Sequence, residues 1–329
     1  MKKFINQVEL VEDQMIAGMV KAYPQYVRKL DCGNVVVRTE KKEGKVALIS
    51  GGGSGHEPAH GGYVGTGMLD AAVAGAVFTS PTPDPIYEGI KAIATDKGVL
   101  MVIKNYTGDV MNFEMAGEMA QMDDIKVAQV VVDDDVAVDG SLYTVGRRGV
   151  AGTVFVHKIA GAKAEQGAEL EEVQRVAQKV VDNVRTMGVA IRPCTVPAAG
   201  KPGFELGEDE MEVGIGIHGE PGTHKEKLRP ADEIVDHILD KILADIDYTG
   251  REVAVMVNSS GATPLMELFI INNHVADVLA EKGIKVYKTF VGEYMTSLEM
   301  EGFSVSLLRL DDEMKALLDA HADTIAFKA

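Results

Sequence analysis

The sequence predicts an α/β protein of two domains, each with a largely parallel or mixed sheet and flanking helices. Three observations support this fold class: the length of 329 residues, the alternation of short β-branched runs with longer amphipathic runs, and a proline- and glycine-rich stretch past the middle. At roughly 150 residues per domain, the length suggests about two domains. Strands that alternate with helices indicate βαβ units and a mainly parallel sheet.

Apolar runs in the first half are typical of buried strands, and the stretches between them are typical of helices. The expected strands are Lys45–Ser50, Ala71–Thr79, Val99–Lys104 and Lys126–Val132. The expected helices are Pro85–Ala94, Met111–Gln121 and Glu169–Met187, the last with five valines on one face (Val173, Val176, Val180, Val181 and Val184). We therefore expect a first domain over residues 1–187.

Prolines and glycines interrupt the chain over Gly188–Glu212, which indicates a boundary between domains. A second α/β domain is expected over residues 188–329. Its predicted strands are Met211–Ile217, Glu252–Val257, Lys285–Val291 and Ser304–Arg309, and its predicted helices are Pro230–Asp247, Ala262–Lys282 and Asp311–Ala320.

Composition excludes several classes of function. Fifty acidic residues against 33 basic ones give a net charge of −17, which argues against nucleic-acid binding through bulk charge. Cys32 and Cys194 are too few for a disulfide framework and fit a reducing compartment. No signal peptide is visible, and apolar runs such as Ala71–Phe78 are too short to span a bilayer. We expect a cytoplasmic protein with no nucleic-acid or membrane partner.

Three predicted strand ends carry unusual residues, and ligands of open α/β sheets bind beyond such ends. The first is a stretch with six glycines and two histidines over Gly51–Gly62. We favour a ligand-binding loop over a plain turn. His56 and His60 match the zinc motif H-E-x-x-H, but Pro58 between them weakens the match. The loop also lacks the Gly-Lys-Ser/Thr ending of a P-loop, and His56 stands where a dinucleotide fingerprint has its third glycine.

The second strand end places Lys104 after an apolar run and Asp109 beside the next helix. Position alone favours a helix N-cap for Asp109, with a general base as the sharper alternative. The third places His218 between Ile217 and Gly219, where a structural histidine and a histidine nucleophile or base are equally supported. The pair Arg147 and Arg148 is expected to be exposed and solvated, with docking of a partner as the minor alternative.

Five long motifs follow one another in the order found in a known family. They are GGGSGHEPAHGGYVG, TSPTPDP, VIKNYTGDVMNFEMA, GRRGVAGTVFVHKIAGA and GIGIHGEPG. Over essentially its whole length the chain resembles the dihydroxyacetone kinases, and specifically the substrate-binding K subunit of the bacterial phosphotransferase-linked type.

The resemblance implies a two-domain homodimer that binds dihydroxyacetone covalently, as a hemiaminal on His218. It also implies a substrate-binding loop made of Gly53, Ser54, Gly55 and His56. Lys104 and Asp109 would contact the substrate hydroxyls, and His56 and Asp109 would be the acid/base pair. If the imidazole of His218 is unperturbed, the adduct should be lost below a pH near 6.5.

The resemblance further implies that this chain binds no cofactor and no metal. ATP-dependent members carry a fused ADP-binding region, for which the chain as given leaves no room. A separate L subunit would hold ADP or ATP with magnesium, and a phosphocarrier M subunit would recharge the nucleotide from phosphoenolpyruvate. Two other hypotheses stay open: a dihydroxyacetone-binding coactivator of a transcriptional regulator, and a zinc hydrolase that uses His56 and His60. The preferred ketone or aldehyde is not defined by the sequence.

Overall fold

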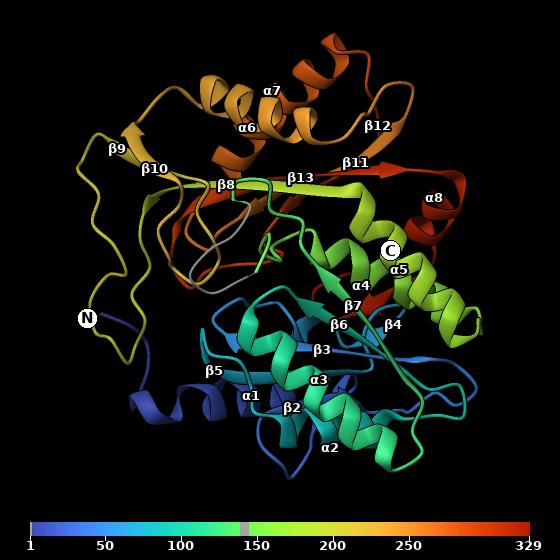
Figure 1. The fold of residues 1–329 in the computed structure, drawn as a ribbon. Helices are drawn as coiled ribbons and strands as arrows, with labels where there is room; N and C mark the ends of the chain where they lie inside the picture. Colours follow the sequence, from blue (N-terminus) through green and yellow to red (C-terminus); the bar gives the residue numbers. More distant parts are fainter. Residues whose placement is uncertain (1, 139–144) are drawn as a thin grey trace.

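The computed structural model describes residues 2–138 and 145–329, and it stacks two six-stranded sheets between layers of helices (Figure 1). The first sheet has the order β1 (Val27–Lys29), β2 (Val35–Arg38), β5 (Ala71–Val77), β3 (Ala47–Ser54), β6 (Val99–Lys104), β7 (Val127–Val132). The last four of these strands are parallel, and β1 and β2 add antiparallel pairings at one edge. All eight residues of β3 are buried, as expected for a parallel strand covered on both faces.

The second sheet is mixed and mainly antiparallel. Its order is β10 (His224–Lys227), β9 (Glu210–Val213), β8 (Val184–Arg192), β13 (Glu301–Leu310), β11 (Glu252–Ser259), β12 (Lys285–Gly292). Strands β11 and β12 form its parallel pair. The fold class expected from the sequence is therefore confirmed, with a mainly parallel sheet first and a mixed sheet second.

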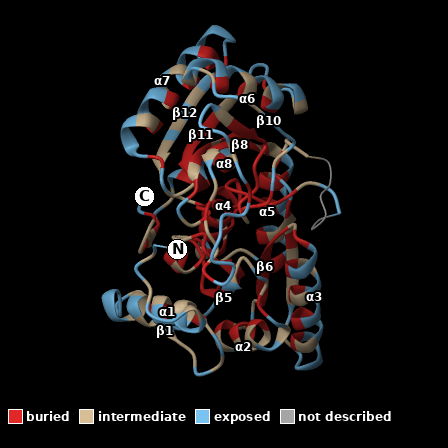
Figure 2. Ribbon diagram, turned by 90° about the vertical axis from the view of Figure 1, so that its left-hand side faces the viewer, coloured by how far each residue is buried: buried red, intermediate tan, exposed pale blue. Residues whose placement is uncertain are grey.

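Helices cover both faces of each sheet, and the hydrophobic clusters show which helix serves which face. Helices α2 (Pro83–Ile93) and α3 (Thr107–Met122) pack on the outer face of the first sheet, and α6 (Ala231–Asp245) and α7 (Leu265–Glu281) on the outer face of the second. Between the sheets lie α4 (Thr153–Glu165), α5 (Leu170–Asn183) and α8 (Asp312–Asp319). The buried residues accordingly concentrate in the middle of the molecule (Figure 2).

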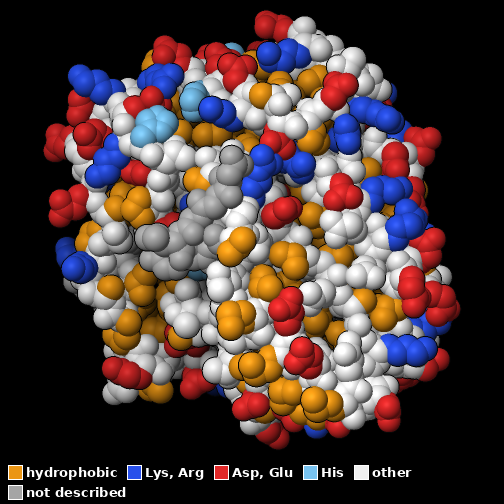
Figure 3. All heavy atoms as spheres, in the orientation of Figure 1, with side chains coloured by type: hydrophobic (Ala, Val, Ile, Leu, Met, Phe, Trp, Pro, Cys, Tyr) orange, Lys and Arg blue, Asp and Glu red, His pale blue; other side chains and the backbone are white. Residues whose placement is uncertain are grey.

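Short elements complete the chain: α1 (Val11–Ala22), the turns η1 (Val8–Leu10) and η2 (Gly61–Tyr63), and a small sheet of β4 (Gly65–Thr66) and β14 (Asp323–Thr324). Helices α1 and α4 were not among the sequence predictions. On the face shown in Figure 3, acidic and basic side chains are interspersed over the surface. No helix in residues 2–138 and 145–329 is long and apolar enough to cross a membrane.

Two predicted elements end four residues earlier than the sequence suggested. The helix predicted to reach Met187 ends at Asn183, because Val184 already pairs with Leu308 in the second sheet. The strand predicted over Met211–Ile217 ends at Val213, because Gly214 adopts a positive φ of 71° and turns the chain out of the sheet.

Candidate functional site

The glycine-rich stretch begins inside the first sheet rather than after it. Strand β3 continues through Gly51–Gly53 to Ser54, four residues beyond its predicted end. At Gly52, where φ is +148°, a Cβ atom would lie 2.4 Å from the Nζ of Lys104 and 3.3 Å from the Oδ2 of Asp109. Glycine at this position therefore lets both charged groups approach the backbone of β3.

Lys104 ends β6 with a completely buried side chain. Its ammonium donates to the carbonyl oxygen of Gly51 at 3.0 Å and lies 3.0 Å from the Nε2 of His60 and 3.5 Å from the Oδ2 of Asp109. Burial lowers the pKa of Lys104, and the carboxylate of Asp109 opposes that shift. A buried amine with a carboxylate beside it can bind and orient a hydroxyl of a small ligand.

Asp109 is not a helix cap, so that interpretation of the sequence was wrong. It is the third residue of α3, and the N-cap position is occupied by Tyr106. The Oδ1 of Asp109 accepts a hydrogen bond from the hydroxyl of Ser80 at 2.5 Å, and its Oδ2 faces Lys104. Ser80 also lines the cleft described below, so the Asp109 carboxylate contacts a residue of the cleft wall. This is a suitable place for a base that acts on a ligand in the cleft.

His56 reaches across to elements from the C-terminal half of the chain. Its Nδ1 lies 2.8 Å from the carbonyl oxygen of Thr296, and its Nε2 lies 3.2 Å from the Nε2 of His218. Burial, with the positive charge of Lys104, lowers the pKa of His56 to about 3, so the ring is neutral. Because a carbonyl oxygen only accepts, we assign the ring hydrogen to Nδ1, which leaves Nε2 as an acceptor.

His218 lies in the loop that follows β9, five residues after the strand rather than at its end. Three rings surround its imidazole: the ring centroids of Tyr106, His56 and Phe78 lie 4.2, 4.7 and 5.5 Å away. Burial, followed by electrostatic interactions with His56 and Lys104, lowers the pKa of His218 well below its ordinary value. The ring is therefore neutral, as a nucleophile must be.

An open cleft of about 510 Å³ leads to His218. Its lining consists of Phe78, Ser80, Tyr106, Thr107, Gly108, Gly203, His218, Gly219, Glu220 and Pro221. Among the described residues, the buried hydroxyl of Tyr106 has no hydrogen-bond partner. A cleft of this size accepts a small molecule, and an unpaired polar group in its wall offers one a hydrogen bond.

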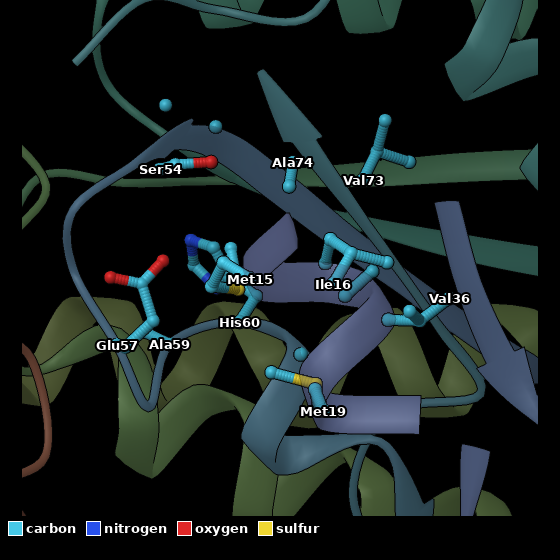
Figure 4. Close-up of a pocket in the computed structure, with 14 residues that line it drawn as sticks. Met15, Ile16, Met19, Val36, Ser54, Glu57, Ala59, His60, Val73 and Ala74 are labelled. Atoms are coloured by element: carbon cyan, nitrogen blue, oxygen red, sulfur yellow. The ribbon is translucent and has the colours of Figure 1, made fainter. Parts of the chain in front are cut away.

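The loop residues before His56 are not among those that line this cleft. The hydroxyl of Ser54 donates to the carbonyl oxygen of Gly75 at 2.7 Å, and the N–H of Gly55 donates to the carboxylate of Glu57. Gly53 and Ser54 line a second, much smaller cavity of about 20 Å³, shared with Glu57, His60 and the methionines of α1 (Figure 4). Substrate binding by Gly53, Ser54 and Gly55 stays a prediction.

The zinc alternative needs His56 and His60 on one face of a helix, and residues 56–60 form turns instead. The imidazoles of His56 and His60 also contact different neighbours. The Nδ1 of His60 lies 3.0 Å from the Nε2 of His157, and its Nε2 faces the ammonium of Lys104. A metal ion bound at the Nε2 of His60 would have to displace that cation. Within the described ranges, no group of three or more potential ligands could hold a metal ion.

Sequence reasoning missed Arg148, which is buried rather than exposed. Its side chain is 1% exposed and pairs with Asp135 and Glu220, whereas Arg147 pairs with Asp245 nearer the surface. The expectation of a solvated basic pair was therefore wrong for Arg148. The glycines on both sides of the pair were the available signal, since they let this segment pack closely.

Comparison with known proteins finds relatives of the same fold over most of the chain. The family model of the Dak1 domain matches residues 17–326. The PTS-dependent dihydroxyacetone kinase 1, dihydroxyacetone-binding subunit DhaK, from Listeria innocua is 56% identical over 329 residues, covering 99% of this chain and all of the relative.

Solved structures have the same fold. The native dihydroxyacetone kinase of C. freundii superposes with a TM-score of 0.93 at 36% identity, over 99% of this chain. This chain spans 60% of that longer chain. The dihydroxyacetone kinase operon co-activator Dha-DhaQ superposes with a TM-score of 0.90 at 37% identity, over 95% of this chain and 97% of that chain.

Proposed function

The chain belongs to the Dak1 domain family and is a dihydroxyacetone-kinase subunit, and from this premise we propose that it holds dihydroxyacetone as a covalent hemiaminal on His218 during phosphorylation. The enzyme is a phosphotransferase that acts on an alcohol group. The observation that carries the proposal is the contact of two neutral imidazoles, His56 and His218, beside an open cleft. The product is dihydroxyacetone phosphate.

The arrangement of the two rings supplies a route for the proton. Because the Nε2 of His56 is an acceptor, the Nε2 of His218 carries the hydrogen that joins them. Transfer of this proton to the Nε2 of His56 frees the in-plane electron pair of the His218 Nε2, and that pair forms the bond to the carbonyl carbon while the C=O π electrons move to the oxygen. His56 returns this proton to the carbonyl oxygen, which becomes the hydroxyl of the hemiaminal. Atoms and charges balance, and both rings end neutral.

Lys104 and Asp109 act on the substrate hydroxyls. The ammonium of Lys104 lies within reach of the Asp109 carboxylate and donates hydrogen bonds. The Asp109 carboxylate serves as the base that removes the proton of the hydroxyl attacking the phosphoryl group. Ser80, which lies between Asp109 and the cleft, gives up its hydrogen bond when the substrate hydroxyl takes its place.

The phosphoryl group comes from a separate L subunit that holds ADP or ATP with magnesium, and an M subunit recharges that nucleotide. Relatives that are dihydroxyacetone-binding subunits of phosphotransferase-dependent kinases support this division of labour. We also propose that the chain is a homodimer and that it works in the cytoplasm. We propose that this chain itself binds no nucleotide, no magnesium and no other metal.

Reconstitution tests the proposed function. The purified chain is mixed with dihydroxyacetone, L subunit, M subunit and a phosphoenolpyruvate-fed phosphoryl supply, and dihydroxyacetone phosphate is measured. We expect turnover with the L subunit and none with ATP alone. Micromolar binding of ATP to this chain alone, measured by calorimetry, would overturn the split-subunit proposal.

A coactivator role is the second candidate function, because the structure of the operon co-activator Dha-DhaQ matches at a TM-score of 0.90. A coactivator has to bind dihydroxyacetone but need not transfer a phosphoryl group to it. His56 and Asp109 are both present, which favours catalysis. A chain that forms the adduct but shows no turnover with its L subunit would favour the coactivator.

A further inference from the structure

A buried arginine holds the loop that carries His218. The guanidinium of Arg148 donates from Nη2 to the carbonyl oxygen of Gly214 at 2.6 Å and from Nε to the Oδ2 of Asp135 at 2.7 Å. Its Nη1 lies 3.4 Å from the Oε1 of Glu220. One side chain therefore connects the start of the loop, where β9 ends, with the residue two positions after His218.

Glu220 closes this loop from the other side. Its Oε2 accepts a hydrogen bond from the backbone N–H of His218 at 2.8 Å, and the side chain is 8% exposed. Gly219, between them, has a φ of +69°, so the chain turns sharply and the carboxylate points back to His218. The backbone of His218 is thus tied to Glu220, and Glu220 is tied to Arg148.

The charges around Arg148 restrict which side chain can replace it. Two buried carboxylates, Asp135 and Glu220, share one buried guanidinium. Burial raises the pKa of both carboxyl groups, and Arg148 opposes the shift in each case. Arginine suits the position because its planar guanidinium offers five donors in a fixed geometry, whereas a lysine ammonium is a point charge.

Attack on a carbonyl needs an imidazole in a defined orientation. The Nε2 of His218 lies 3.2 Å from the Nε2 of His56, and a shift of the loop would break this contact. We propose that Arg148 and Glu220 are positioning residues that hold His218 in the orientation for attack on the substrate carbonyl. The proposal rests on the proposed function of His218 and assigns neither residue a contact with the reacting atoms.

Gly216 provides a variant that moves Glu220 without removing a charge. A Cβ atom at this position would lie 1.9 Å from the Oε1 of Glu220 and 2.8 Å from the Nη1 of Arg148. Gly216→Ala therefore has to displace the carboxylate. Arg147→Lys is the matched control, because Arg147 is the neighbouring arginine and its guanidinium pairs with Asp245 at 2.6 Å.

The experiment compares Glu220→Ala, Glu220→Gln, Gly216→Ala and Arg148→Lys with wild type and with Arg147→Lys. Dihydroxyacetone labelled with carbon-13 at its carbonyl reports the adduct by NMR, because the ketone carbon becomes tetrahedral in the hemiaminal. KM and kcat are measured with the L subunit, and thermal melting shows that each variant is folded at the assay temperature. The whole chain is used throughout.

We expect Glu220→Ala and Gly216→Ala to raise KM and the concentration for half-maximal adduct at least about tenfold, within the ~100-fold that a misplacement of 1 Å can cost. We expect kcat to change less than about threefold, since the base Asp109 is untouched. Glu220→Gln should recover part of the loss, because its amide oxygen still accepts from His218. Arg148→Lys should resemble Glu220→Ala, and Arg147→Lys should match wild type.

Wild-type KM and adduct in folded Glu220→Ala and Gly216→Ala would overturn the positioning proposal. An equal effect of Arg147→Lys on KM would also overturn it, because a general loss of packing would then explain the result. If wild type itself forms no tetrahedral adduct carbon, the failure lies in the proposed function of His218, and the two failures are thereby distinguished.

Discussion

The two sheets position their functional side chains in different ways. The first sheet places Lys104 at the end of a parallel strand and Asp109 in the first turn of the next helix. The second sheet ends β9 at Val213 and presents His218 from an irregular loop. A parallel sheet positions residues by its regular geometry, whereas the loop depends on contacts with Arg148 and Glu220.

This difference separates two tasks that substitutions can test one at a time. If the proposed function is right, the loop of the second sheet captures the substrate, and the strand ends of the first sheet orient and deprotonate it. Variants in the loop should then affect the adduct, and variants at the strand ends should affect affinity and turnover with the adduct retained.

The largest effect is expected for His218→Ala. Loss of the imidazole removes the nucleophile, so the hemiaminal should be abolished and glycerol, which lacks a carbonyl, should compete with dihydroxyacetone. Carbon-13 NMR or a crystal soak measures the adduct. His224→Ala is the control, because His224 is an exposed histidine of the same sheet. An adduct that persists in His218→Ala, or one found on His56, would remove the assigned role of the second sheet.

Asp109→Asn should reduce turnover by about 10²-fold or more, the range typical of the loss of a general base. Asparagine keeps the size of the side chain and can still accept from Ser80, so the substrate should still form its adduct on His218. Coupled assays with the L subunit measure turnover, and NMR measures the adduct in the same sample. Nearly unchanged turnover would show that the first sheet does not supply the base.

Lys104→Met should raise KM by about 10- to 100-fold, since hydrogen bonds from charged groups contribute ~1.5–3 kcal/mol. Methionine keeps the apolar stem but removes the ammonium that faces Asp109. Lys45→Met is the matched control: Lys45 is buried to a similar extent, but its ammonium pairs with Asp70 at 2.6 Å rather than with Asp109. A similar rise in KM for both variants would mean that loss of stability, rather than loss of a substrate contact, explains the result.

The smallest effect is expected for acidification. A pKa of about 3 for His56, and a pKa of His218 well below its ordinary value, mean that both imidazoles stay neutral as the pH falls through 6.5. The amount of adduct that the chain forms with dihydroxyacetone, without the L subunit, should therefore change less than about twofold between pH 8 and pH 5. The expectation from an unperturbed imidazole, loss near pH 6.5, is thus revised.

The check is NMR of the adduct across this pH range, with circular dichroism to establish that the chain stays folded. A midpoint near 6.5 in a folded chain would show that His218 titrates as an exposed histidine. That result would contradict a neutral pair of imidazoles and would show that His218 titrates separately from His56.

Much of the fold could be predicted from periodicity. The strand Val99–Lys104 was predicted at its observed bounds, and α7 and β12 within three residues at each end, because their apolar residues follow the period of one structure. Val184 was misassigned because it continues the valine pattern of α5. Its pairing with Leu308, more than a hundred residues away, decides that it belongs to a strand.

The sequence by itself determined the α/β class, the glycine-rich stretch that begins at Gly51, and the presence of His56, Lys104, Asp109 and His218 at or near strand ends. These are local properties. Glycine permits close approach to the backbone wherever it stands, and the end of an apolar run marks the end of a buried strand. The family resemblance added the roles of these residues, which local patterns left open.

Only the tertiary structure decided which groups meet. Residues 56 and 218 are 162 positions apart, and their Nε2 atoms are 3.2 Å apart. The burial of Arg148 against Asp135 and Glu220 was equally invisible, because a charged residue is expected at the surface until its partners are known. Burial and neighbouring charge, which set the pKa of each imidazole, arise from packing between distant segments, and no local pattern encodes them.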